Sequence, residues 1–172
     1  MTLIVAPAEP AESFVSLVDA ATYHTARGNA AWAAIASDTV REQLLRKAAD
    51  YMEQVYRERW SGRRVNATQV LSWPRYEVPI RDTGGYYTGL VYYASTTVPL
   101  IVANACAELA LRAATITLAP DLNPPVTGET VGPITVTYAD GARQQVRYQA
   151  IDNMLQPFLL GGRFGIAMTE RA

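Results

Sequence analysis

Few residues of this chain have side chains that could carry chemistry, and they lie far apart in the sequence. Histidine occurs once, at His24, and cysteine occurs once, at Cys106. A zinc site or a similar metal site needs three or four such ligands at fixed spacings, so we expect no metal and no cofactor. Cys106 lies in an apolar stretch, which predicts a small core residue in a reduced compartment. His24 is expected to be a packed or a surface histidine.

Sequence motifs for nucleophilic catalysis or phosphate binding do not occur. The chain has no GxSxG, no GxxxxGK[ST] and no strand-borne GxGxxG. The glycine pairs at 84–85 and 161–162 lie in predicted turns, without the helix start that a phosphate-binding loop requires. Acid pairs such as Asp50 and Glu53 lie on the charged face of a predicted helix. We therefore expect a protein that is not an enzyme.

Tyrosines gather in one short segment, residues 80–97: Tyr86, Tyr87, Tyr92 and Tyr93. Beside Arg75 and Arg81 they could stack the bases of a single DNA strand. The formal net charge of the chain is only -1, however, and binding through phosphates needs an excess of Lys and Arg. Tyrosine is also frequent at protein contacts, so we interpret these side chains as contacts to a partner protein, with nucleic acid as the alternative.

The element around which the chain is organised is a helix predicted from Thr97 to Ala119. Its polar residues are spaced four, four and three apart and so form one narrow stripe: Asn104, Glu108, Arg112 and Thr115. Nearly all its other residues are apolar, which is typical of a helix packed on several sides. We expect Pro99 in its first turn, after a cap at Thr96 or Thr97. Pro120 is expected to end the helix.

A membrane span is the competing interpretation of this apolar run. Glu108 and Arg112 near its middle argue against it, because each charge would cost about 2.5 kcal/mol or more in lipid. The same two residues stand at i and i+4 in the favourable order for an ion pair. The first ten residues lack the basic region and the long apolar run of a signal peptide. We therefore expect no membrane contact and a protein that stays where it is made.

Two helices are predicted earlier in the chain. The first runs from Leu17 to Arg27, with Ser16 as its cap, and Trp32 just after it is interpreted as a core anchor. The second runs from about Thr39 to Trp60 and is amphipathic, with apolar residues at threes and fours on one side and charged residues on the other. It is expected to begin at a cap, Ser37 or Asp38.

Hairpins or ordered loops are predicted in two places, besides a short β-prone run at Thr2–Val5. Residues 80–97 contain the turn signal DTGG and are interpreted as a hairpin or a long ordered loop. Residues 121–133 are rich in Pro, Gly and Thr and predict a linker. A second hairpin is predicted to pair 134–138 with 145–148. A lone two-stranded hairpin is marginal in water, so we expect it to gain strands or a cover, for example from a neighbouring copy.

The predicted fold is mainly α, a small helical bundle with a C-terminal β-hairpin and an extended C-terminal arm. One domain spans 1–172, with a helical body at 1–120, the linker and hairpin at 121–149, and a short helix and tail at 150–172. We interpret the segment from Ile151 to the C terminus as an arm that docks on a partner and contributes little to the protomer's own fold. The alternative is an arm that folds back onto the body.

Seven stretches of the chain carry a resemblance to a known family: Ser13–Ser16, Ala21–Ala34, Leu45–Tyr51, Gly62–Val65, Leu71–Arg75, Val98–Ala113 and Val131–Ile134. They resemble the head-to-tail adaptor, or connector, proteins of tailed bacteriophages, which are often labelled DnaT-like single-stranded-DNA-binding proteins. The resemblance runs from about Ser13 to Leu160 and rests on packing and capping residues, so it points to the family and not to a site. The tyrosine-rich run Gly85–Ser95 departs from the family pattern.

The resemblance implies a structural virion protein, assembled in the host cytoplasm and located in the neck of the virion. Copies would form a ring below the portal, expected to be a dodecamer, that extends the DNA channel and joins the head to the stopper or tail. The partners implied are other copies of the chain, the portal protein, a stopper or tail-completion protein, and double-stranded DNA that passes without tight binding. The alternative function is single-stranded-DNA binding in replication.

The residues expected to make these contacts fall into two sets. Contacts to the portal or to a neighbouring subunit are predicted at the C-terminal arm: Phe158, Leu159, Arg163, Phe164, Ile166 and Met168. Contacts to a subunit or to the tail are predicted at the tyrosine-rich loop and the hairpin: Tyr86, Tyr87, Tyr92, Tyr93, Ile134, Val136 and Tyr138.

Overall fold

The computed structural model describes residues 2–83, 89–120, 129–131, 134–136 and 146–161. These residues form five α-helices: α1 (Leu17–Ala26), α2 (Ala30–Ala33), α3 (Asp38–Tyr56), α4 (Leu100–Ala113) and α5 (Gln149–Leu155). Short 3-10 helices follow α3 and α5: η1 (Arg57–Arg59) and η2 (Gln156–Phe158). Four short strands complete the list: β1 (Arg63–Arg64), β2 (Arg75–Tyr76), β3 (Glu129–Val131) and β4 (Ile134–Val136). The predicted mainly helical fold with a small hairpin near the C terminus is confirmed.

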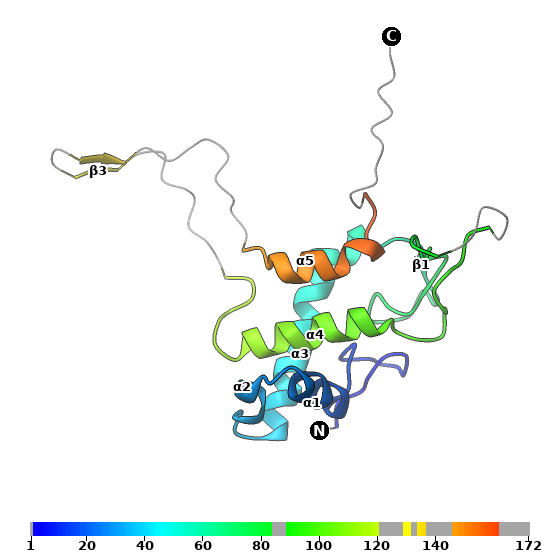
Figure 1. The fold of residues 1–172 in the computed structure, drawn as a ribbon, viewed down its shortest axis with the longest axis horizontal. Helices are drawn as coiled ribbons and strands as arrows, with labels where there is room; N and C mark the ends of the chain where they lie inside the picture. The colour runs from blue at the N-terminus through cyan, green and yellow to red at the C-terminus, as the bar shows by residue number, and fades with distance from the viewer. Residues whose placement is uncertain (1, 84–88, 121–128, 132–133, 137–145, 162–172) are drawn as a thin grey trace, which may run out of the picture.

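The helices pack around α4. Figure 1 shows α3 as the long axis of the body, with α4 crossing it, α5 on one side of α4, and α1 and α2 on the other. Helix α4 packs on α3, α1 and α5. No helix of the described residues is long and apolar enough to cross a membrane.

Helix α4 is buried on most of its sides, as its composition predicts. Its fully buried residues are Val102, Ala105, Cys106, Ala107, Leu109 and Ala110. The Glu108 to Arg112 ion pair is present, with 2.7 Å between Oε2 and Nη1. The predicted ends of the helix were wrong, because Pro99 is itself the N-cap and the helix stops at Ala113 rather than at Pro120. The run of β-branched residues at 115–117 accounts for the early end, since such residues disfavour helix.

The other helix starts follow local capping chemistry. The Ser16 hydroxyl accepts a hydrogen bond from the Asp19 backbone N–H at 3.0 Å, and the Ser37 hydroxyl accepts one from Val40 at 3.3 Å. After α3 and η1 the chain turns at Gly62, whose φ is +69°. A Cβ at this position would collide with the Tyr76 carbonyl oxygen, so the turn requires glycine.

The two small sheets are both antiparallel pairs. Strand β1 pairs with β2, with Arg63 opposite Tyr76. Strand β3 pairs with β4, with Thr130 opposite Thr135, so the predicted pairing of 134–138 with 145–148 was wrong. Residues 146–148 form no strand, and Gln145 lies outside the described residues. The sequence explains the outcome, because the β-prone runs ETV and ITV are separated by only two residues, which is the spacing of a tight hairpin.

The base of the tyrosine-rich loop is ordered by backbone hydrogen bonds. The Ile80 N–H donates to the Val91 carbonyl at 2.8 Å, and the Tyr93 N–H donates to the Val78 carbonyl at 2.9 Å. The two sides of the loop therefore run antiparallel at their base, in agreement with the predicted hairpin or ordered loop.

The C-terminal helix belongs to the core of the body. Ile151, Leu155 and Phe158 are fully buried, and their spacing of four and three places them on one helical face. The Phe158 carbonyl accepts hydrogen bonds from the Ser61 backbone N–H at 2.8 Å and from its hydroxyl at 2.7 Å. The prediction that the segment from Ile151 onward contributes little to the protomer's fold was therefore wrong as far as Leu159.

Candidate functional site

Two of the residues predicted to bind a partner lie in the interior. The Phe158 and Leu159 side chains are buried inside the protomer, so neither is exposed at its surface. Phe158 packs edge-on against Trp73, with ring centroids 5.7 Å apart, and lies 5.0 Å from the Tyr93 ring. Tyr93 is thus a partly buried packing residue, whereas Tyr92 beside it is exposed.

The remaining predicted contacts lie on β4 or outside the described part of the chain. Ile134 and Val136 are the first and last residues of β4. The residues outside the described ranges are Tyr86, Tyr87, Tyr138, Arg163, Phe164, Ile166 and Met168. The contacts predicted for these seven residues therefore stay predictions.

Arg75, which could have stacked a base, has a structural role instead. Its guanidinium donates to three backbone carbonyls, those of Ser61 at 2.8 Å, Gly62 at 2.8 Å and Ser72 at 3.1 Å. Burial of the group, aided by the nearby charge of Arg64, lowers the Arg75 pKa. The side chain therefore braces the turn after α3 and is not available to a nucleic acid.

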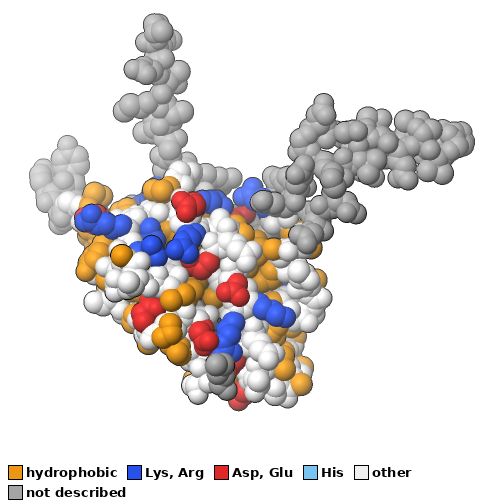
Figure 2. Space-filling model, turned by 180° about the vertical axis from the view of Figure 1, so that it is seen from behind, with side chains coloured by type: hydrophobic (Ala, Val, Ile, Leu, Met, Phe, Trp, Pro, Cys, Tyr) orange, Lys and Arg blue, Asp and Glu red, His pale blue; other side chains and the backbone are white. Residues whose placement is uncertain are grey.

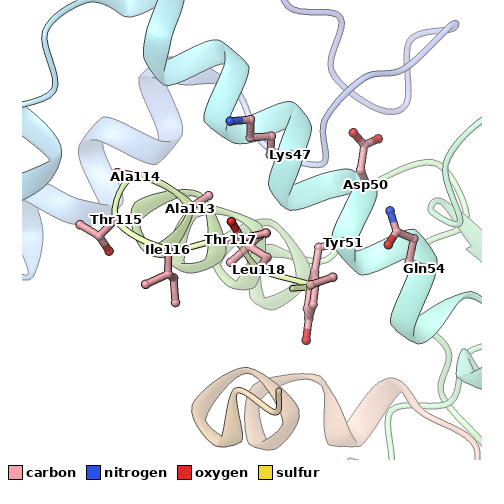
Figure 3. Close-up of a pocket in the computed structure, with 11 residues that line it drawn as sticks. Lys47, Asp50, Tyr51, Gln54, Ala113, Ala114, Thr115, Ile116, Thr117 and Leu118 are labelled. Atoms are coloured by element: carbon pink, nitrogen blue, oxygen red, sulfur yellow. The ribbon is translucent and has the colours of Figure 1, made fainter. Parts of the chain in front are cut away.

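A groove runs along one side of α3 and is here called the α3 groove. It consists of two adjoining hollows of about 510 and 750 Å³ that share part of their lining. Lys47, Tyr51 and Gln54 line it from α3, at spacings of four and three that place them on one face. Residues 113–120, which follow α4, form the opposite wall (Figure 3).

At the far end of the α3 groove, the Asp152 carboxylate joins side chains from two segments by hydrogen bonds. Asp152 accepts a hydrogen bond from the Tyr56 hydroxyl at 2.8 Å and one from Arg147 Nε at 2.9 Å. Tyr148 donates to the Leu118 carbonyl at 3.1 Å, which ties the chain leaving α4 to the chain entering α5. Burial, reinforced by Asp152, raises the Tyr56 pKa, so this phenol stays protonated and acts as a donor at neutral pH.

The α3 groove also carries positive charge. Lys47 and Arg59 are exposed, and the Arg59 guanidinium carbon lies 5.3 Å from the centroid of the Tyr56 ring. Arg147 adds a third cation at the rim, although its ion pair with Asp152, at 2.8 Å, offsets that charge. Asp50 lies beside Lys47. A groove with so few uncompensated cations could contact a phosphate backbone, but only weakly.

Arginines are denser at the end of α3, in the sequence RERWSGRR from Arg57 to Arg64. Arg63 forms an exposed ion pair with Glu77 at 3.1 Å and stands opposite the exposed ring of Tyr76. Figure 2 shows Lys and Arg side chains gathered on the same end of the molecule as β1 and α5, with Asp and Glu among them. This arginine-rich end was missed from the sequence, although four arginines within eight residues are a readable signal.

His24 and Cys106 are interior residues. The His24 Nε2 lies 3.1 Å from the Ala107 carbonyl, and its Nδ1 lies 3.1 Å from the Asn29 amide nitrogen. A neutral ring protonated at Nε2 satisfies both contacts, and burial lowers the His24 pKa. Burial raises the pKa of the Cys106 thiol to about 12, so it is not a thiolate at neutral pH. Among the described residues, no three His, Cys, Asp or Glu side chains are grouped as metal ligands would be.

The comparison with known families covers the whole chain. Residues 1–172 match the family described as "Putative DnaT-like ssDNA binding protein", and the chain belongs to this family. No curated protein and no solved structure matches the chain. The family description names single-stranded-DNA binding and does not name a virion role.

Proposed function

We propose that this protein is a structural subunit without enzymatic activity, a head-to-tail adaptor of a tailed bacteriophage. Copies assemble into a ring, expected to be a dodecamer, that docks below the portal protein and continues the DNA channel towards the stopper or tail. The ring is part of the virion neck and assembles in the host cytoplasm. The resemblance of the sequence to adaptor proteins, from Ser13 to Leu160, supports this proposal.

The observation that carries the proposal is the β3 and β4 pair. Within the described part of the chain, no further strand extends this two-stranded sheet. Figure 1 shows the pair apart from the helical body. Because two strands alone are marginal in water, both edges of the pair favour addition of strands or a cover from another subunit. A symmetric ring supplies such a neighbour to every copy.

The charge of the chain supports the same function. A channel through which DNA slides must not hold it, and the net charge of -1 gives no strong attraction to phosphates. The ion pairs at the arginine-rich end and in the α3 groove further reduce the free positive charge there. Both surfaces are therefore suited to brief contacts with passing DNA.

Single-stranded-DNA binding is the second candidate function. The family description favours it more directly than it favours the adaptor. Arg57, Arg59 and Arg63, with the exposed rings of Tyr76 and Tyr92, offer cations and aromatic surfaces of the kind that bind single strands. Under this function the arginines would neutralise phosphates, so binding would be tight and steeply dependent on salt.

Sedimentation and DNA titration on the same preparation separate the two functions. The adaptor proposal predicts self-association of the purified chain, or its binding to portal particles. It also predicts weak binding of labelled oligo(dT) at physiological salt, with a shallow dependence of affinity on salt. A monodisperse monomer that ignores portal particles but binds oligo(dT) at nanomolar concentration, with a steep salt slope, would contradict the adaptor proposal and support the second candidate.

A further inference from the structure

A second groove lies on the opposite side of the body from α5 and is here called the N-terminal groove. Its volume is about 620 Å³, and its walls come from the N-terminal segment, α1 and the start of α4. Most of its lining is apolar and includes Val5, Phe14, Val15, Val98, Leu100 and Ala103. Leu100, in the first turn of α4, is 72% exposed, although leucine normally gains by burial.

The rim of the N-terminal groove carries two fixed charges. Asp19 lies in the first turn of α1, and Arg27 caps the other end of that helix. The Arg27 guanidinium lies over the Tyr23 ring, 3.6 Å from its centroid, and donates to the Tyr23 carbonyl at 3.2 Å. This cation is therefore held in place before any partner arrives, which lowers the entropy lost on binding.

The last eleven residues of the chain have alternating apolar residues, which suit binding to an apolar groove. In GRFGIAMTERA, residues 162–172, the apolar residues Phe164, Ile166 and Met168 recur at every second position. An extended chain places alternate side chains on one side, so these three would form one apolar face about 13 Å long. Arg163 and Glu170 flank this face, and their charges are opposite to those of Asp19 and Arg27 respectively, so the two pairs are complementary.

The position of the chain exit favours a groove on another copy. The Leu160 N–H donates to the Arg59 carbonyl at 2.6 Å, which fixes the exit to η1 at the far end of α3. Figure 1 shows α5 and α1 on opposite sides of α4. A ring of identical subunits joins them head to tail, so each protomer contacts its two neighbours through two different surfaces. The exit at Gly161 and the N-terminal groove are two such surfaces.

We propose that residues 162–172 of one copy dock in the N-terminal groove of the next copy, with Phe164, Ile166 and Met168 against its apolar walls. This inference rests on the proposed self-assembly and goes further by naming both sides of the joint. It explains why Leu100 is exposed on the subunit, because the tail of a neighbour covers it in the assembly.

Disulfide trapping between two full-length variants tests the joint. A chain with Leu100→Cys is mixed with a chain carrying Ile166→Cys under mild oxidation. The proposal predicts a disulfide-linked dimer that contains one chain of each variant. The matched control replaces Leu100→Cys by Ile116→Cys. Ile116 lies three residues after the C-terminal end of α4 and its native side chain is 48% exposed, and no such dimer is expected. The native Cys106 is fully buried and does not compete.

A double variant with both substitutions in one chain distinguishes the neighbour from the chain's own tail. Linked dimers or longer chains of copies support the proposal. An intrachain disulfide that leaves only monomers overturns it, since the tail would then occupy its own groove. Equal trapping with the Ile116→Cys control also overturns it, because the contact would then be unspecific.

Sedimentation of Leu100→Arg separates failure of this inference from failure of the adaptor proposal. Because the native side chain is mostly exposed, the helical circular dichroism should not change. The proposal predicts self-association weakened roughly tenfold or more, and the same loss in Phe164→Ala with Ile166→Ala. If the unmodified chain assembles and Leu100→Arg assembles equally well, only the groove assignment fails. If the unmodified chain stays a monomer, both the assignment and the self-assembly fail.

Discussion

Replacing Phe158 with alanine tests whether η2 is part of the protomer core. The native ring is fully buried, packs edge-on against Trp73 and touches the Tyr93 ring. Its backbone carbonyl keeps the hydrogen bonds from Ser61 in the variant, so the substitution removes packing alone. A buried Phe→Ala change costs about 3–5 kcal/mol, because it loses burial and leaves a cavity.

This loss is large for a protein of this size. A domain is stabilised by about 5–15 kcal/mol in total, so Phe158→Ala should remove a substantial part of that free energy of unfolding. The melting temperature should fall by roughly 6–20 °C, since 1 kcal/mol corresponds to about 2–4 °C at this length. Urea unfolding followed by tryptophan fluorescence measures the change directly, because Trp73 lies against the substituted ring.

The matched control is Leu160→Ala, two residues further on. Leu160 is 61% exposed, so its truncation should change the free energy of unfolding by less than about 0.5 kcal/mol. If Phe158→Ala costs less than 1 kcal/mol, or if both variants cost the same, the placement of η2 in the core is refuted. The segment would then be the partner-docking arm that the sequence alone predicts.

Four further predictions concern other parts of the molecule. Deletion of residues 162–172 should leave helicity and melting temperature nearly unchanged while abolishing attachment to a neighbour or to portal, and unfolding of the truncated chain would contradict this. Burial lowers the pKa of His24 below its usual 6.5, so the stability that the neutral ring contributes is complete above pH 6.5 and falls as the pH drops towards the folded pKa. The urea midpoint of the native chain should therefore be lower at pH 5.5 than at pH 7.5, and His24→Gln should make this difference smaller. Gly62→Ala should destabilise the fold by more than about 1 kcal/mol in urea unfolding, because its φ is positive and Tyr76 blocks a Cβ, whereas an unchanged midpoint would count against the turn as described. Arg59→Ala should weaken oligo(dT) binding and flatten its salt slope in anisotropy titrations, more than Arg27→Ala does, if the arginine-rich end contacts DNA.

Local chemistry made much of the fold predictable from the sequence. Ser16 and Ser37 cap their helices because a short hydroxyl side chain satisfies a free N–H whatever the distant packing. The burial of α4 follows from its composition, and the Glu108 to Arg112 pair follows from spacing alone.

Predictions failed where two local signals competed or where distant packing decided. The end of α4 depended on β-branched residues at 115–117 rather than on Pro120, although both disfavour helix. Strand β4 pairs with β3 across two residues, where a pairing with 145–148 was predicted, since the shorter connection also joins β-prone runs. The burial of Phe158 depends on Trp73 and Tyr93, which are distant in sequence, and no local pattern reveals such contacts.

The candidate surfaces were less predictable than the fold. Arg75 is separated from Ser61 by thirteen residues. Only the folded structure shows that its guanidinium donates hydrogen bonds to three backbone carbonyls. The arginines from Arg57 to Arg64 could have been recognised from the sequence. That they lie with other Lys and Arg side chains on one end of the molecule follows only from the folded arrangement of α3, β1 and α5 (Figure 2).

Electron microscopy of the purified full-length chain, alone and mixed with portal particles, tests the central proposal most directly. The adaptor function predicts closed rings, or added density of one subunit layer on the portal, without any requirement for DNA. Isolated small particles that leave the portal unchanged, together with filaments or clusters formed only on single-stranded DNA, would contradict the adaptor function.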